Sequence, residues 1–131
     1  MALHIFTDNI INNKPLKIFN NGKHSRSFTY IDDIIDSIYK LIFKSDSLLE
    51  KYLIFNIGGD KPINLMDYVA LIEETLSIKG SYEFLPLQKG DVEKTESDTD
   101  SLYQAINFKP QTNLDIGIKK FINWYIKYYK I

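Results

Sequence analysis

Apolar residues recur along this chain mainly at helical spacing. The clearest pattern spans Asp33–Lys44, where the apolar side chains fall three and four residues apart; they are Ile34, Ile35, Ile38, Leu41 and Ile42. Residues 1–13 show a weaker helical pattern, and Pro15 ends it because proline cannot continue a helix. Three further helices are predicted over residues 65–79, 99–106 and 116–128. The pattern therefore predicts five helices.

Residues suited to helix caps precede two of these segments. Asn64 is the expected N-cap of the third helix, with Asp67 three residues later in a weak capping box. Asp98 or Thr99 is the expected cap of the fourth helix. These caps place the two helix starts to within a residue or two.

Short apolar runs between the helices predict strands. Leu16–Phe19 alternates, and Tyr82–Leu85 is a second short candidate. Bulky and β-branched residues at 28–31 favour an extended backbone. The run Tyr52–Ile57 is almost continuously apolar, which is typical of a strand buried on both faces in a parallel sheet.

The predicted fold class is thus α/β, a small mixed domain of about five helices and three or four short strands. Such strands are too few and too scattered for an independent sheet of the usual size. We therefore expect the partners of the Tyr52–Ile57 strand to lie outside this sequence.

Composition and charge exclude several function classes. The 131 residues include 16 Lys and Arg against 17 Asp and Glu, which gives a net charge of -1. The protein therefore has no overall positive potential that would attract nucleic acid or an anionic membrane. The absence of Cys excludes disulfides and thiolate sites, and two distant histidines make a metal site unexpected. No apolar run approaches a membrane span. We expect a soluble, cytoplasmic protein with neither nucleic acid nor membrane as a partner.

Aromatic residues near the end of the chain have two interpretations. Trp124, Tyr125 and Tyr128 lie at helical spacing, beside lysines that would suit base stacking on nucleic acid. The spacing favours burial in the core, with the lysines forming a solvated last turn that the helix dipole stabilises.

The most informative stretch is Arg26–Ile34, which reads Arg-Ser-Phe-Thr-Tyr-Ile-Asp-Asp-Ile. It joins a turn at Asn20–Lys23 to the strongest helix. Asp32 and Asp33 are suited to the helix start, where carboxylates accept free backbone N–H groups. Adjacent residues on a helix do not face each other, so capping explains this pair better than acid–base catalysis does.

This stretch resembles a signature of extended short-chain dehydrogenases/reductases, in the nucleotide-sugar epimerase branch. Further segments resemble the same branch in the same order; they are Met1-Ala2-Leu3, Pro15–Phe19, Phe55–Gly58, Gln88–Val92 and Phe108–Thr112. Sequences similar to UDP-glucuronate 4-epimerases match best, and the resemblance covers nearly the whole chain. It implies that residues 1–131 are equivalent to the C-terminal UDP-sugar-binding domain of such an enzyme, without its N-terminal NAD-binding Rossmann domain.

Two features that the family uses for hydride transfer are missing from the sequence. The family holds NAD on a Gly-rich turn and uses a Tyr with a Lys four residues later as base. The six glycines here include no Gly-x-x-Gly-x-x-Gly, and none of the nine Tyr has Lys four residues on. No catalytic residue and no cofactor are therefore expected in this chain, and NAD is implied only for the full-length family.

The resemblance assigns part of a UDP-sugar site. Arg26 matches the arginine that grips the UDP diphosphate, a role for which a planar guanidinium is suited. Gln88 and Asp91 match a loop that contacts phosphate and ribose; the alternative for these two is a plain polar turn. Leu16, Ile18 and Phe19 match the strand bordering the uracil, although an apolar strand residue is as readily part of the core. Ala2 matches the substrate loop and completes the predicted UDP-sugar site.

Three functional hypotheses remain open at this stage. The chain is a UDP-sugar-binding part that is inactive alone, either as a remnant or together with a separately encoded NAD-binding half. Alternatively, it is a non-catalytic structural module that self-associates through an apolar former domain interface. An active enzyme of unrelated mechanism is the third hypothesis, and it lacks a nucleophile or metal constellation.

Overall fold

Five α-helices and two short sheets make up the described part of the chain, which comprises residues 2–45, 48, 52–59 and 61–131 of a computed structural model. The predicted α/β class is confirmed. Met1, the first residue of the Met1-Ala2-Leu3 segment considered above, lies outside the described residues.

The first sheet pairs two predicted strands. Helix α1 (Ala2–Ile11) precedes β1 (Leu16–Phe19), which runs parallel to β4 (Tyr82–Leu85). Leu16 lies opposite Tyr82, and Phe19 lies opposite Leu85. The side chains of β1 alternate between buried and exposed up to Ile18, as the sequence pattern predicted.

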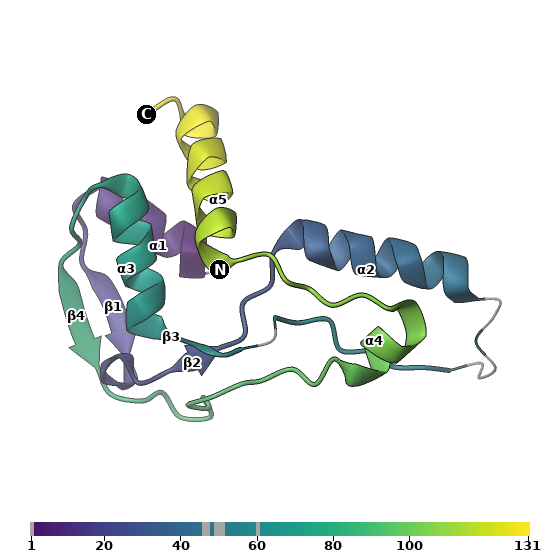
Figure 1. Cartoon of the computed structure of the whole chain (residues 1–131). Helices are drawn as coiled ribbons and strands as arrows, with labels where there is room; N and C mark the ends of the chain where they lie inside the picture. Colours follow the sequence, from purple (N-terminus) through teal and green to yellow (C-terminus); the bar gives the residue numbers. More distant parts are fainter. Residues whose placement is uncertain (1, 46–47, 49–51, 60) are drawn as a thin grey trace.

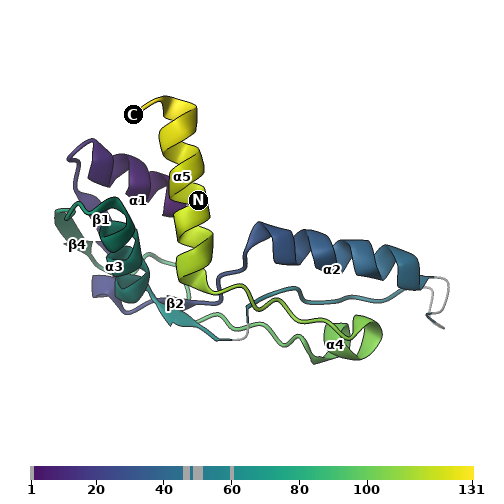
Figure 2. The ribbon, with the colours of Figure 1, turned by 45° about the horizontal axis from the view of Figure 1, so that its top comes forward.

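Helices α1, α3 (Leu65–Leu76) and α5 (Leu114–Tyr129) pack beside this sheet and form one lobe with it (Figures 1 and 2). Apolar side chains from α1, β1, α3 and α5 meet in a single cluster, whose buried members are Phe6, Ile10, Leu16, Ile18, Tyr68, Val69, Ile72, Ile118 and Ile122. This cluster is the core of the molecule.

The prediction that the aromatic residues of the last helix are core is correct only for Tyr125. Its exposed fraction is 3%, whereas Trp124 is 48% and Tyr128 is 65% exposed. The buried stripe of α5 runs through Ile118, Ile122 and Tyr125, at three- and four-residue spacing. Trp124 and Tyr128 lie beside that stripe and stack on each other, with ring centroids 5.1 Å apart.

The second sheet brings the Arg26 stretch to the start of α3. Strand β2 (Ser25–Arg26) follows the short 3-10 helix η1 (Asn20–Gly22) and pairs antiparallel with β3 (Ile63–Asn64). The predicted extended stretch at 28–31 is not a regular strand, because residues 28–30 carry no regular secondary structure and Ile31 is the first residue of the next helix. Asn64 then begins α3, and its side-chain oxygen accepts a hydrogen bond of 2.8 Å from the Met66 N–H. The predicted N-cap is confirmed.

We expect Asn64→Ala to lower the free energy of unfolding by about 1 kcal/mol, because the Met66 N–H loses its partner. Asn113 is a matched control, since it is the N-cap of α5 but its side chain makes no capping hydrogen bond. Urea unfolding of both variants checks this. An equal loss in Asn113→Ala would contradict the assignment.

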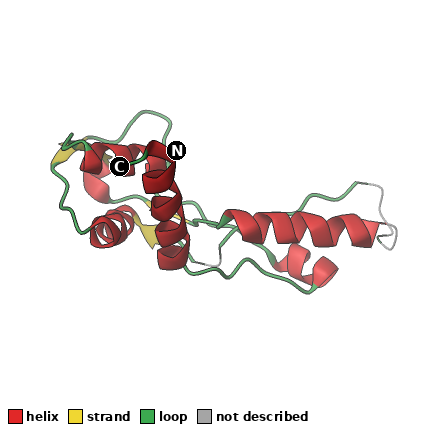
Figure 3. Cartoon of the chain, turned by 90° about the horizontal axis from the view of Figure 1, so that it is seen from above, coloured by secondary structure: helices red, strands yellow, loops and turns green. Residues whose placement is uncertain are grey.

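An arm extends from the lobe (Figures 1 and 3). It contains helix α2 (Ile31–Lys44), segment 52–59 and helix α4 (Asp100–Ile106), with α2 in contact with α4. Leu102 and Ile106 of α4 are buried there. Of the two predicted caps, Thr99 occupies the N-cap position of α4 but its side chain makes no capping hydrogen bond. The Asp98 carboxylate instead accepts a hydrogen bond of 3.0 Å from the Asp100 N–H.

Asp33 joins the arm to the segment before α5 rather than capping its own helix. The N-cap of α2 is Tyr30, without a side-chain cap. The Asp33 carboxylate instead accepts hydrogen bonds of 2.8 Å from both the N–H and the hydroxyl of Thr112. The capping prediction for Asp33 is therefore wrong, because its side chain faces this neighbouring segment. Asp32 lies 3.7 Å from the Lys120 ammonium.

Asp33→Ala is expected to lower the free energy of unfolding by about 2 kcal/mol, because it leaves a half-buried backbone N–H and a hydroxyl without an acceptor. Asp32→Ala removes the same charge from the same helix turn at an exposed site and should change stability by less than about 0.5 kcal/mol. Thermal or denaturant unfolding compares the two. Equal effects would show that charge, and not the Thr112 contact, is responsible.

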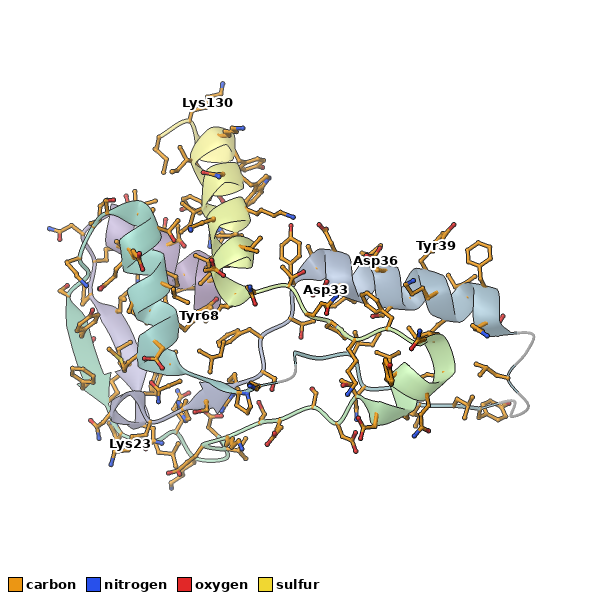
Figure 4. The ribbon with its side chains drawn as sticks, viewed as in Figure 1. Lys23, Asp33, Asp36, Tyr39, Tyr68 and Lys130 are labelled. Carbon is orange, nitrogen blue, oxygen red and sulfur yellow. The ribbon has the colours of Figure 1, made fainter. Side chains whose placement is uncertain are left out.

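Much of the apolar surface of the arm is open to solvent. One face of α2 is exposed along its length, and we call it the α2 stripe; its residues are Ile31, Ile35, Ile38, Tyr39, Ile42 and Phe43. Figure 4 shows Tyr39 projecting outward from the arm.

The prediction that Tyr52–Ile57 forms a buried strand is wrong for the described fold, because this segment is also exposed to solvent. Segment 52–59 carries no regular secondary structure, and Tyr52 and Ile54 are 92% and 93% exposed. No strand within the described residues pairs with it, so the burial that its sequence is suited to is not provided by this fold.

Candidate functional site

Arg26 lies in β2 and holds the loop before α4 with its guanidinium. Nη1 donates to the carbonyl oxygens of Ser25 and Glu93, both at 3.0 Å. Nη2 donates to the Val92 carbonyl at 2.7 Å and to Asp91 Oδ1 at 2.9 Å. Two of the predicted site residues, Arg26 and Asp91, are therefore in direct contact across 65 positions of sequence.

Backbone contacts fix the same loop. The Asp91 N–H donates to the Gln88 carbonyl at 3.2 Å, across a turn in which Gly90 has a φ of 86°. That positive φ suits glycine, which has no Cβ to clash. The Ser25 N–H donates to the Glu93 carbonyl at 2.8 Å, next to Arg26. The loop is thus tied to β2 by backbone and side chain together, while the Gln88 side chain is exposed.

His24 adjoins this pair, and sequence reasoning missed it. Its ring is buried, and its Nε2 lies 3.4 Å from Asp91 Oδ2 but makes no hydrogen bond within the described residues. Asp91 therefore lies between a cation and a buried imidazole. Only its place two residues before Arg26 could have drawn attention to His24.

The apolar candidates lie elsewhere in the fold. Leu16 and Ile18 are fully buried in the core, so their side chains are closed to a ligand and only the backbone of β1 is available for a contact. Phe19 is half-buried at the end of β1, where η1 begins. These positions accord with the core interpretation for two of the three side chains.

Ala2 lines a separate, mainly apolar pocket of about 330 Å³ between the first turns of α1, α2 and α5. Its wall includes Phe28 and Tyr68, whose rings stack with centroids 4.1 Å apart. Burial raises the pKa of the Tyr68 phenol well above its ordinary value, so the hydroxyl stays protonated. The structure does not bring Ala2 into contact with the Arg26–Asp91 pair.

A separate polar cluster surrounds Glu73 on α3, and no sequence motif pointed to it. Glu73 accepts hydrogen bonds from Lys79 Nζ at 2.8 Å, from the Gly80 N–H at 2.9 Å and from the Tyr82 hydroxyl. Burial alone would raise the pKa of this carboxyl, but the hydrogen bonds outweigh it and hold the pKa below its usual value. Burial, and then the hydrogen bond to Glu73, raise the pKa of Tyr82 to about 12. The cluster joins α3 to β4.

No group of three His, Cys, Asp or Glu among the described residues is placed to hold a metal ion. None of the helices in that part of the chain combines the length and apolar character that crossing a lipid bilayer requires.

A family model and individual relatives of known name indicate the same family for this chain. Residues 2–58 match the NAD dependent epimerase/dehydratase family. A probable UDP-glucuronate 4-epimerase of Rhizobium meliloti is 34% identical over 145 residues, covering 99% of this chain and 42% of its own. The chain belongs to the NAD-dependent epimerase/dehydratase family.

Two further similar proteins accord with this assignment. A 37.6 kDa protein of Escherichia coli O111:H- is 39% identical over all of this chain and 43% of its own length. The UDP-glucuronic acid 4-epimerase of Bacillus cereus, solved in complex with UDP-glucuronic acid and NAD, is 25% identical with a TM-score of 0.78, over 95% of this chain and 40% of that one. The predicted family is confirmed, and the chain spans about two fifths of the length of these relatives.

Proposed function

We propose that this family member forms the sugar-nucleotide-binding part of an NAD-dependent epimerase, acting on a UDP-sugar such as UDP-glucuronate. The observation that carries the proposal is the Arg26–Asp91 pair, in which a guanidinium and a carboxylate converge on one loop although 65 residues separate them. Guanidinium groups suit diphosphate, and a carboxylate can accept hydrogen bonds from ribose hydroxyls. The solved relative with UDP-glucuronic acid supports the choice of ligand.

The Arg26 contacts imply how a diphosphate would bind. Both Nη groups already donate to protein oxygens. A phosphate oxygen would take the place of Asp91 Oδ1 on Nη2, while the three carbonyl contacts continue to orient the guanidinium. Asp91 would then be released toward the ribose or toward His24, which lies 3.4 Å away.

The residues present do not fit NAD. The sequence contains neither the Gly-rich turn that cradles a dinucleotide nor a Tyr with Lys four residues later. We infer that residues 1–131 correspond to the C-terminal substrate domain of the relatives. In the relatives, the NAD site and the catalytic base then belong to the part that this chain does not match. On this proposal the chain alone has no epimerase activity.

Calorimetric titration of the chain with UDP and, separately, with NAD tests this function. We expect UDP to bind and NAD not to bind. Failure of UDP to bind would contradict the sugar-nucleotide site, and binding of NAD would contradict the division of roles. Uridine is a useful control ligand, since it lacks the diphosphate that Arg26 is proposed to hold.

A self-associating structural module is the second candidate, and the exposed α2 stripe is the observation that favours it. Sedimentation over a wide concentration range distinguishes the two hypotheses. A stable oligomer that does not bind UDP would support the module. A monomer that binds UDP would support the sugar-nucleotide site.

A further inference from the structure

His24 is a buried histidine whose ring nitrogen Nε2 reaches toward Asp91 without bonding to it. The residue is 6% exposed, and Nε2 lies 3.4 Å from Asp91 Oδ2 with no hydrogen bond within the described residues. Buried polar atoms are almost always hydrogen-bonded, so one without a partner needs a reason. The side chains of Arg26 and Asp91 are 29% and 35% exposed. His24 therefore adjoins Asp91 on the buried side of the Arg26–Asp91 pair.

The backbone fixes where the His24 ring can lie. Side chains two residues apart on an extended chain point to the same side, so His24 and Arg26 both face the Asp91 loop. The His24 carbonyl accepts a hydrogen bond of 2.8 Å from the Leu65 N–H, at the start of α3. Because the imidazole is held in this way, a change in the His24–Asp91 contact depends mainly on how the carboxylate turns.

The two oxygens of the Asp91 carboxylate have different surroundings. Oδ1 accepts hydrogen bonds of 2.9 Å from Arg26 Nη2 and from the Val92 N–H, whereas Oδ2 faces His24. A diphosphate that occupies Nη2, as proposed above, takes the cation from Oδ1 and brings further negative charge beside it. Like charges at this range disfavour each other. An imidazole that takes up a proton supplies the missing positive charge and an N–H donor for Oδ2.

Asp91 is the charged group on which a proton at His24 acts. Among the described residues it is the one that forms an ion pair with His24. The Glu93 carboxylate instead accepts from Asn20 Nδ2 at 3.4 Å, and Lys94 pairs with Glu96 at 2.8 Å. The other charged residues on the adjoining elements are Lys23, Arg26 and Asp67.

From these observations we propose that His24 is a positioning residue of the sugar-nucleotide site, which takes up a proton when the diphosphate binds and then holds Asp91 away from Arg26. The inference rests on the proposed function, because it states where Asp91 goes once Arg26 is occupied. The proton comes from solvent, and an N–H bond is the only covalent bond that forms. Linkage is reciprocal, so proton uptake on binding means that UDP binds more tightly as the pH falls. The gain is lost as the pH rises through the range in which histidine deprotonates, about pH 5–8.

Calorimetric titration of the full chain with UDP over a range of pH tests the role of His24. From about pH 7.5 to about pH 5.5, the affinity of the parent should rise about tenfold relative to that of His24→Gln. Glutamine keeps a hydrogen-bond donor for Asp91 but does not titrate. The terminal phosphate of UDP takes up a proton near pH 6 by itself, and this contribution is common to both proteins. Titrations in two buffers of different ionisation enthalpy should show more proton uptake for the parent.

His4 provides the matched control, since it is the other histidine of the chain and lies on α1 beside Tyr129. His4→Gln should keep the pH profile of the parent. Asp91→Asn keeps His24 but removes the negative charge that a protonated imidazole would hold, so this variant should lose the additional proton uptake.

Nuclear magnetic resonance of the parent chain gives a second readout that needs no variant. At about pH 7 the ring nitrogen shifts of His24 should move toward imidazolium values on saturation with UDP, while those of His4 stay unchanged. Unchanged His24 shifts, or the same pH profile in the parent and His24→Gln, would overturn this inference and leave the UDP site standing. Failure of UDP to bind at any pH would instead refute the proposed function, and this inference with it.

Discussion

Replacing Glu73 with alanine is expected to lower the free energy of unfolding by about 3 kcal/mol. The carboxylate is almost fully buried, at 1% exposure, and accepts three hydrogen bonds that join α3 to β4. Its loss leaves the Gly80 N–H and the Tyr82 hydroxyl without their acceptor, and hydrogen bonds to a charged group are among the more costly to lose. Denaturant unfolding at neutral pH measures the effect.

Glu74 is the matched control for this prediction. It is the next residue of the same helix and is exposed, so Glu74→Ala should change stability by less than about 0.5 kcal/mol. A similar loss in both variants would mean that acidic charge on α3 matters more than the contacts of Glu73.

The pH dependence of the Glu73 contribution has a defined sign. The hydrogen bonds lower the folded-state pKa of Glu73 below its unfolded value. Its contribution is therefore complete above the unfolded pKa, about 4.3, and is lost as the pH falls through the lower folded pKa. We expect the stability difference between the parent and Glu73→Gln to narrow below about pH 4.3. A difference that stays constant down to pH 2 would contradict this assignment.

Arg26→Ala is expected to weaken UDP binding about 100-fold, because a charged donor to phosphate contributes about 2–3 kcal/mol. The same change removes four hydrogen bonds, three of which hold the loop from Asp91 to Glu93, so some stability is lost as well. Calorimetric titration with UDP should therefore accompany an unfolding measurement on each variant. Arg26→Lys keeps the charge without the planar fork and should bind with intermediate affinity.

Lys94 provides the control for charge in the Arg26 loop. Its ammonium is exposed and pairs with Glu96 at 2.8 Å, away from the guanidinium contacts. Lys94→Ala should leave UDP affinity within about twofold of the parent, since exposed ion pairs contribute little. If Arg26→Ala binds UDP as tightly as Lys94→Ala, the diphosphate role of Arg26 is refuted.

Local pattern alone predicted most helices and the strands of the parallel sheet. Helical spacing located α2 and α5, and alternation located β1, because side-chain periodicity is a property of neighbouring residues. The Asn64 cap was predictable for the same reason, since the capped N–H lies two residues away. The family was also recognisable from motifs in order along the chain, and the comparisons confirm it.

The tertiary structure decided what those patterns could not. Arg26 meets Asp91 across 65 residues, and Asp33 meets Thr112 across 79, so neither pairing has a local signature. The same limit explains the corrections for Asp33, for Trp124 and Tyr128, and for segment 52–57. The chemistry of an apolar or carboxylate side chain determines which surroundings stabilise it, but the path of the whole chain determines which residues lie next to it. For residues 52–57 the sequence specifies a sheet interior, and the described fold leaves that segment open to solvent.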